Sequence, residues 1–100
     1  MSDKAELIKV FAKSIQDLLS KIPIDFRLLQ EIRLRINGPL ILNYDGREMF
    51  VTENGSVSNN IEKAYLVNKR ELMETMEYIG NYSLYAFEDE IRQGFITGNL

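Results

Sequence analysis

Two arginines, Arg33 and Arg35, have the type and spacing that could bind an anion. They alternate with Ile32 and Leu34, so an extended backbone would place both guanidinium groups on one face, about 7 Å apart. Two guanidinium groups at that separation can bind a phosphate or the carboxylates of a partner. Glu31 falls on the same face, and the spacing alone favours a surface ion-pair row over an anion site.

Four aromatic side chains lie within ten residues near the C-terminal end, an arrangement found in proteins that stack single-stranded bases. They are Tyr78, Tyr82, Tyr85 and Phe87. Five carboxylates between positions 74 and 90 would repel the phosphate backbone that such proteins must attract. We therefore expect no nucleic-acid partner, and we assign the aromatic residues to the core or to an interface, with Tyr82 and Tyr85 as the interface candidates.

Several kinds of catalytic and cofactor site are excluded by what the chain lacks. It has no cysteine and no histidine, which removes thiolate nucleophiles, imidazole bases and Cys/His zinc sites. The acidic run Glu88-Asp89-Glu90 points in three directions on a helix, so we interpret it as a solvated face. No glycine is followed by lysine, so the phosphate-binding loop of nucleotide hydrolases is absent. We expect no catalytic residue, cofactor or metal site within these 100 residues.

Length and composition predict one small globular domain over residues 1–100, with 45% hydrophobic and 27% charged residues. The net charge of −3 is uneven, because the first half carries a slight positive excess and the second half a negative one. No apolar run approaches the roughly 20 residues that span a bilayer. The N-terminus lacks the apolar stretch of a secretion signal, so we expect a cytoplasmic protein.

The first 22 residues are predicted to form one amphipathic helix, and residues 23–100 an α+β sheet region. The helix is expected over 4–21 and ends before Pro23. One of its faces carries Leu7, Phe11, Ser14, Ile15, Leu18 and Ile22. A short helical piece over 25–30 precedes a meander of three strands, around 31–36, 40–42 and 49–51, with turns at Asn37-Gly38 and Asp45-Gly46. A short fourth strand is expected over 64–67.

Two helices are predicted in the C-terminal part of the chain. Asn68 and Glu71 have the spacing of a capping box, which begins a helix that Gly80 ends. Its apolar side would carry Leu72, Met73, Met76 and Ile79, with the two methionines filling the core. A second helix is expected over 83–94 and a strand from 95 to 97. The sum is an α+β fold, in which a mostly antiparallel sheet of three to five strands is covered by the N-terminal helix and these two helices.

Two sequence blocks resemble the N-terminal region of the stage III sporulation protein AA family. The more specific block is NYSLYAFEDEIRQGFIT, from Asn81 to Thr97. The supporting block is Glu31 to Arg35, followed by Gly38-Pro39-Leu40. The resemblance covers about 23–97. That family is similar to the ATPases of type II and type IV secretion systems, in which a PAS-like α+β domain precedes the motor domain.

This resemblance implies a domain whose motor, with its ATP and magnesium, lies beyond residue 100. The relatives often use arginines of this domain at a neighbouring subunit's nucleotide site, which makes Arg33 and Arg35 candidate inter-subunit or phosphate contacts. Where relatives commonly carry a basic residue, two positions before the aspartate-glycine turn, this chain has Asn43. The family's next strand would follow Thr97, so we expect an unpaired sheet edge here, which favours self-association.

The resemblance implies a non-catalytic assembly or regulatory domain of a sporulation-channel ATPase. Its partners would be its own motor domain, neighbouring subunits in a homo-oligomer, and membrane proteins of the channel. It would lie in the cytoplasm of the mother cell, peripheral to the membrane that faces the forespore. The alternative is a free-standing adaptor that binds a protein through its sheet edge or through the Tyr82 and Tyr85 surface.

Overall fold

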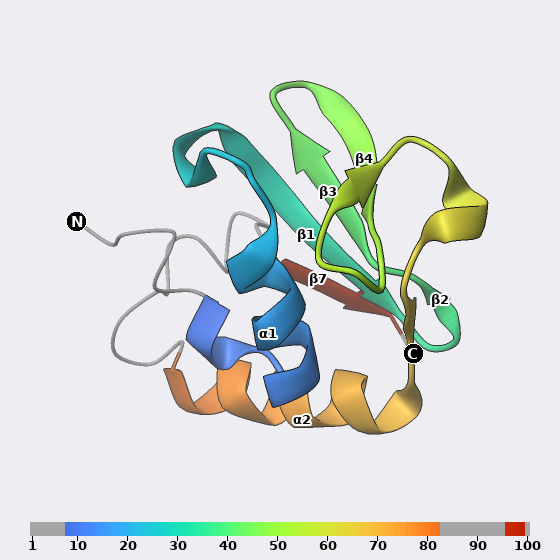
Figure 1. Cartoon of the computed structure of the whole chain (residues 1–100). Coiled ribbons are helices and arrows are strands. Elements are labelled where there is room, and N and C mark those ends of the chain that lie inside the picture. Colours follow the sequence, from blue (N-terminus) through green and yellow to red (C-terminus); the bar gives the residue numbers. More distant parts are fainter. Residues whose placement is uncertain (1–7, 83–95, 100) are drawn as a thin grey trace.

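The fold combines a five-stranded sheet, a two-stranded sheet and two α-helices, as the computed structural model shows for residues 8–82 and 96–99 (Figure 1). The α+β prediction is confirmed. The helices are α1 (Lys13–Lys21) and α2 (Lys69–Tyr82), and the short 3-10 helices are η2 (Phe26–Leu28) and η3 (Ile61–Lys63). The strands are β1 (Leu29–Arg35), β2 (Gly38–Pro39), β3 (Ile41–Tyr44), β4 (Arg47–Val51), β5 (Val57–Ser58), β6 (Leu66–Val67) and β7 (Ile96–Asn99).

The main sheet has the strand order β5-β4-β3-β1-β7 and is antiparallel except at one end. The predicted three-strand meander forms β1, β3 and β4, which pair as successive antiparallel neighbours. Asp45 and Gly46 make the β3–β4 turn with φ angles of 49° and 79°, the left-handed geometry that such a tight hairpin needs. Strand β7 pairs with β1 in parallel, with Ile96 opposite Ile32.

The predicted fourth strand forms, but it joins a different sheet. Strand β6 pairs with β2, which follows Asn37, a non-glycine residue in the left-handed region with φ 57°. The Asn37 N–H donates to the carbonyl of Val67 at 2.7 Å, next to the pairing of β2 with β6. One further bridge, between Thr52 and Ala64, joins the segment before β6 to the end of β4.

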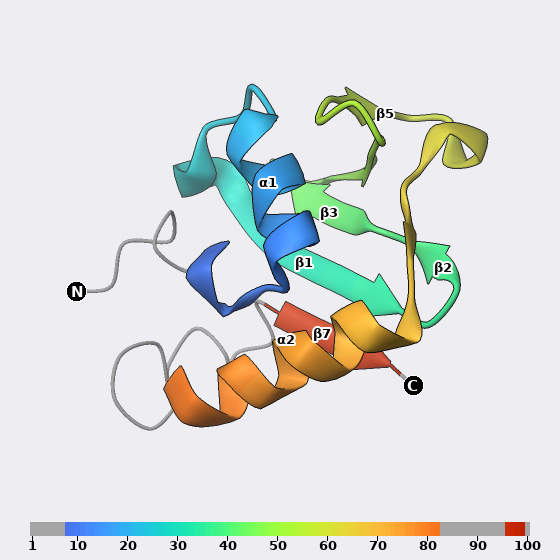
Figure 2. The ribbon, with the colours of Figure 1, turned by 60° about the horizontal axis from the view of Figure 1, so that its bottom comes forward.

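Both α-helices cover the same face of the main sheet, where the core lies (Figure 2). Strand β1 contributes Ile32 and Leu34, which are 1% and 0% exposed, and α2 contributes Leu72. The buried residues from the N-terminal part are Val10, Phe11, Ile15, Leu18, Leu19 and Ile22. A second, smaller cluster of Ile41, Phe50 and Ala64 lies apart from this core.

The helix predicted over 4–21 is wrong at its start within the described residues. Residues 8–10 form a 3-10 turn, and Ala12 has ψ 147°, so α1 begins only at Lys13. The Ala12 N–H donates to Thr75 Oγ1 at 3.0 Å, and Phe11 is fully buried. Burial and this tertiary hydrogen bond override the local helical preference of the segment.

Two predictions for α2 are also wrong. The helix does not end at Gly80 but continues to Tyr82. Met73 and Met76 are 49% and 43% exposed and therefore do not fill the core. Thr75 is fully buried instead, where its hydroxyl accepts from the Ala12 N–H just before α1, and the methionines lie on a part of the helix that faces solvent. The helix predicted over 83–94 lies outside the described residues.

Candidate functional site

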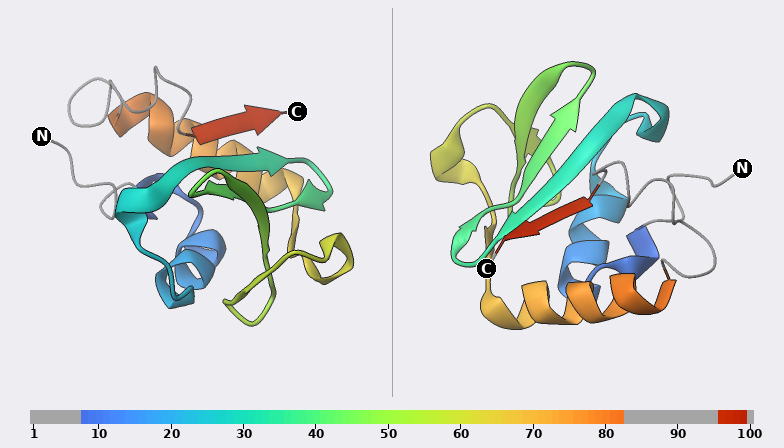
Figure 3. Two further views of the ribbon diagram at one scale, coloured as in Figure 1. Left: turned by 90° about the horizontal axis from the view of Figure 1, so that it is seen from above. Right: turned by 180° about the vertical axis from the view of Figure 1, so that it is seen from behind.

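The candidate site is the sheet face that carries neither α-helix, which we call the open face (Figure 3, right). Arg33 and Arg35 lie on it, because β1 alternates strictly from Ile32 and those two arginines face away from the core. The predicted division of this strand into apolar and charged faces is confirmed. The strand register adds neighbours from β3 and β4: Ile41, Asn43 and Phe50.

Arg33 is held in place by a polar row across β1 and β3. Its Nη2 lies 3.3 Å from Oε1 of Glu31, and the same oxygen accepts a hydrogen bond from Asn43 Nδ2 at 2.5 Å. The side chains of Arg33 and Glu31 are 42% and 18% exposed, so the pair is partly shielded from water. The predicted ion pair therefore exists, yet the guanidinium keeps further N–H donors for a ligand.

Arg35 sits at the rim of the open face, where β1 ends. Its side chain is exposed and makes no ion pair within the part of the chain that the structure describes. The following turn packs closely on its stem, since a Cβ on Gly38 would lie 2.9 Å from the Cβ of Arg35. Among the described residues nothing pairs with this charge, which lies about 7 Å along the strand from Arg33.

The arginines lie beside the small cluster of Ile41, Phe50 and Ala64, whose side chains are buried. Ile41 lies directly opposite Arg33 in the sheet register, and Phe50 lies opposite Ile41. The groups that this face offers to a partner are therefore its guanidinium groups, and arginine is enriched in protein interfaces. The open face therefore suits a protein partner that carries carboxylates or a phosphate.

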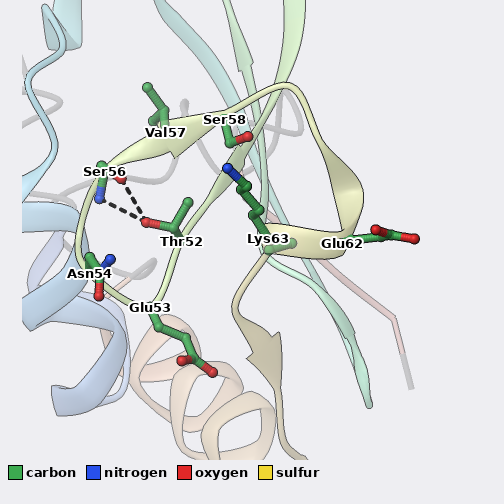
Figure 4. Close-up of a pocket in the computed structure, with 9 residues that line it drawn as sticks. Thr52, Glu53, Asn54, Ser56, Val57, Ser58, Glu62 and Lys63 are labelled. Atoms are coloured by element: carbon green, nitrogen blue, oxygen red, sulfur yellow. Dashed lines mark hydrogen bonds between the residues drawn. The ribbon is translucent and has the colours of Figure 1, made fainter.

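A separate polar hollow of about 530 Å³ lies between the β4–β5 turn and η3 (Figure 4). Thr52 Oγ1 lies 2.7 Å from Ser56 Oγ, so these two hydroxyls hydrogen-bond to each other within the loop. Lys63 extends across the hollow toward Ser58, while Glu53 and Glu62 point away from it. Among the described residues, no three acidic side chains gather closely enough to hold a metal ion.

Comparison with known proteins places this chain in a family. A family model described as "Sporulation stage III, protein AA" matches residues 1–99. The chain belongs to this family. The Stage III sporulation protein AA of Bacillus subtilis (strain 168) is 31% identical over 93 residues, which cover 92% of this chain and 26% of that relative. The chain thus spans about a quarter of the curated relative's length.

Membership of the sporulation stage III protein AA family supports a role in sporulation. No solved structure matched the chain. The likeness to PAS domains is not tested by the described elements and stays a prediction. Within the described ranges, neither helix has the length and apolar character needed to cross a membrane.

This sporulation-family domain also contains a buried carboxylate whose role sequence reasoning missed. Glu71 is 4% exposed, and its Oε2 accepts hydrogen bonds from the hydroxyls of Ser14 and Tyr65. Its Oε1 accepts from the backbone N–H of Asn68 at 2.9 Å, and Asn68 Oδ1 accepts from the Glu71 N–H at 2.8 Å. The capping box is confirmed, and these four residues, the Glu71 cluster, also join α1 to α2. One sign of this cluster is present in the sequence: Ser14 is a polar residue on the otherwise apolar face of the first helix, and it donates to Glu71.

The Glu71 cluster predicts a pH effect on stability through Tyr65. Burial, with the Glu71 carboxylate beside the hydroxyl, raises the pKa of Tyr65 from 10.0 to about 12. Because the folded-state pKa is raised, the stabilisation is fully present below about pH 10 and is lost as the pH rises through about 12.

We expect wild-type protein to lose more free energy of unfolding over this range than Tyr65→Phe, as measured by urea denaturation at a series of pH values. Parallel stability curves for the two proteins would contradict this prediction.

The predicted interface tyrosines are only partly placed by the structure. Tyr82 ends α2, and Tyr85 lies outside the described residues, as do Phe87 and the acidic run 88–90. Their interface role therefore stays a prediction.

Proposed function

We propose that this chain is the non-catalytic assembly domain of a sporulation ATPase, and that its open face contacts the adjoining motor or a neighbouring subunit. The family match supports a role in sporulation, and the curated relative is several times longer, which leaves room for a motor. The supporting structural observation is Arg35, an exposed guanidinium at the strand end with no ion pair among the described residues.

In this proposal Arg33 and Arg35 act on a group that the neighbouring subunit presents. Arg33 is oriented by Glu31, and Arg35 is free to approach a phosphate or carboxylate at the rim. Guanidinium groups suit both ligands because they form paired hydrogen bonds with planar or trigonal oxygens. ATP and magnesium would belong to the motor, and the full protein would form a homo-oligomer at the membrane facing the forespore, with membrane proteins of the channel as further partners.

We expect Arg33→Ala and Arg35→Ala in the full-length protein to lower ATP turnover by about tenfold or more, since charge stabilisation at a transferring phosphate is lost. Arg47→Ala is the matched control. Arg47 is an exposed arginine of the same sheet, but it pairs with Tyr44, which packs on the core, so Arg47 does not belong to the open face. Steady-state phosphate release, with circular dichroism to verify folding, measures the effect.

The 100-residue chain alone should show no ATP turnover after repurification. Wild-type turnover in both arginine variants would remove the open face from the proposed role. Turnover that persists in the isolated chain would contradict its non-catalytic nature.

A further inference from the structure

The exposed side of α2 carries a stripe whose residues complement a second copy of the same stripe. Lys69, Met73, Met76 and Gly80 recur at spacings of four, three and four, which places them along one line of the helix. All four are exposed, the methionines at 49% and 43%. The buried Leu72 and Thr75 lie on a different side of α2, so the stripe does not face the core, and α2 lies along one edge of the molecule (Figures 1 and 3).

Gly80 is the least expected member of this stripe. Glycine inside a helix costs about 1 kcal/mol relative to alanine. A Cβ at this position would meet nothing within 4 Å, so the chain's own packing does not require a glycine there. A missing side chain on an exposed helix line permits close approach by a side chain from another molecule.

The charged residues beside the stripe would pair with the same residues of a second copy if the two helices were antiparallel. Arg70 and Glu77 are exposed, are two helical turns apart, and flank the same side of the stripe. Neither makes an ion pair within the described part of the chain. When two such helices pack antiparallel around a two-fold axis, equivalent flanking positions meet, so Arg70 of each copy lies beside Glu77 of the other.

We propose that two copies of this chain associate through an antiparallel, two-fold contact between their α2 helices. The two-fold axis passes between Met73 and Met76, so Met73 of each copy packs on Met76 of the other. The same symmetry places the Lys69 stem of one copy over Gly80 of the other. This contact is independent of the proposed motor contact, because it uses neither Arg33 nor Arg35.

The contact is expected to be weak. Stable interfaces bury about 1,200–2,000 Å² in total, which a pair of short helices does not reach, so we expect a dissociation constant on the order of 10⁻⁴ M. Sedimentation equilibrium of the 100-residue chain at low salt, up to about 2 mM, should give a mass that rises with concentration toward the dimer.

Charge reversal provides the decisive test. Arg70→Glu and Glu77→Arg should each weaken association about tenfold, because symmetry places the repelling pair twice in the interface. The double variant Arg70→Glu/Glu77→Arg should restore it to within about twofold. The two single changes shift the net charge in opposite directions, so a loss in both cannot come from overall repulsion.

Apolar substitutions provide the matched control. Met73→Glu should abolish the dimer, whereas Leu66→Glu should not, although Leu66 is 61% exposed, because it lies on β6 and outside the stripe. Thermal unfolding verifies that every variant is folded. A wild-type chain that stays monomeric at the highest concentration, failure of the double variant to restore association, or an equal loss in Leu66→Glu would overturn the proposal.

Discussion

Glu71→Ala is expected to lower the free energy of unfolding by about 3 kcal/mol. The change removes the acceptor for the hydroxyls of Ser14 and Tyr65 and for the N–H of Asn68, and it leaves a gap at a position that is 4% exposed. It also disconnects α1 from α2 at this point. Urea denaturation followed by circular dichroism measures the loss.

Two control variants separate the buried cluster from an ordinary surface contact. Glu74→Ala removes a carboxylate of the same helix that accepts one hydrogen bond, from Tyr78 at 3.0 Å, and it should change stability by no more than about 0.5 kcal/mol. Glu71→Gln keeps an acceptor oxygen and should fall between the two. Equal losses for Glu71→Ala and Glu74→Ala would show that the Glu71 cluster does not stabilise the fold.

Gly55→Ala is expected to destabilise the protein by about 3 kcal/mol, through backbone strain and a steric clash together. Gly55 has φ 75°, in the left-handed region that disfavours a side chain. A Cβ there would lie 2.7 Å from Cβ and 2.8 Å from Cδ of Lys21, at the end of α1. Because the nearest atom belongs to the base of that side chain, the turn or the helix must shift.

Gly46 offers a matched control for this substitution. It has nearly the same φ, 79°, but an added Cβ would meet nothing within 4 Å. Gly46→Ala should therefore show the backbone cost alone, about 1 kcal/mol. The difference between the two variants in urea denaturation measures the clash with Lys21. Equal losses would mean that the β4–β5 turn does not pack closely on α1.

Features that depend on neighbouring residues were predictable from sequence. The Asp45-Gly46 turn, the alternation along β1 and the capping box of α2 each arise within a few residues, and each is present. The open face was partly predictable as well, because alternation assigns Arg33 to the face opposite Leu34. Whether that face binds a partner could not be decided by pattern, since the ion pair with Glu31 suits a structural role equally well.

Features that depend on distant contacts were not predictable. Thr75 is buried where its hydroxyl accepts from the Ala12 N–H just before α1, and Met73 lies on a part of the helix that faces solvent. A helical apolar pattern cannot show which of two adjacent lines faces the core when a polar residue lies inside. The parallel pairing of β7 likewise joins residues with no local relation to β1.

The position of β7 has a consequence for the order in which the chain can fold during synthesis. Strands β1, β3 and β4 are joined by short turns, so the ribosome delivers them early and together. Strand β7 pairs with β1, with Ile96 opposite Ile32, so it lies far along the sequence from its partner and emerges after the other three strands. Until then one side of β1 has no strand partner, so a nascent chain that stalls before β7 exposes backbone that can pair with another polypeptide.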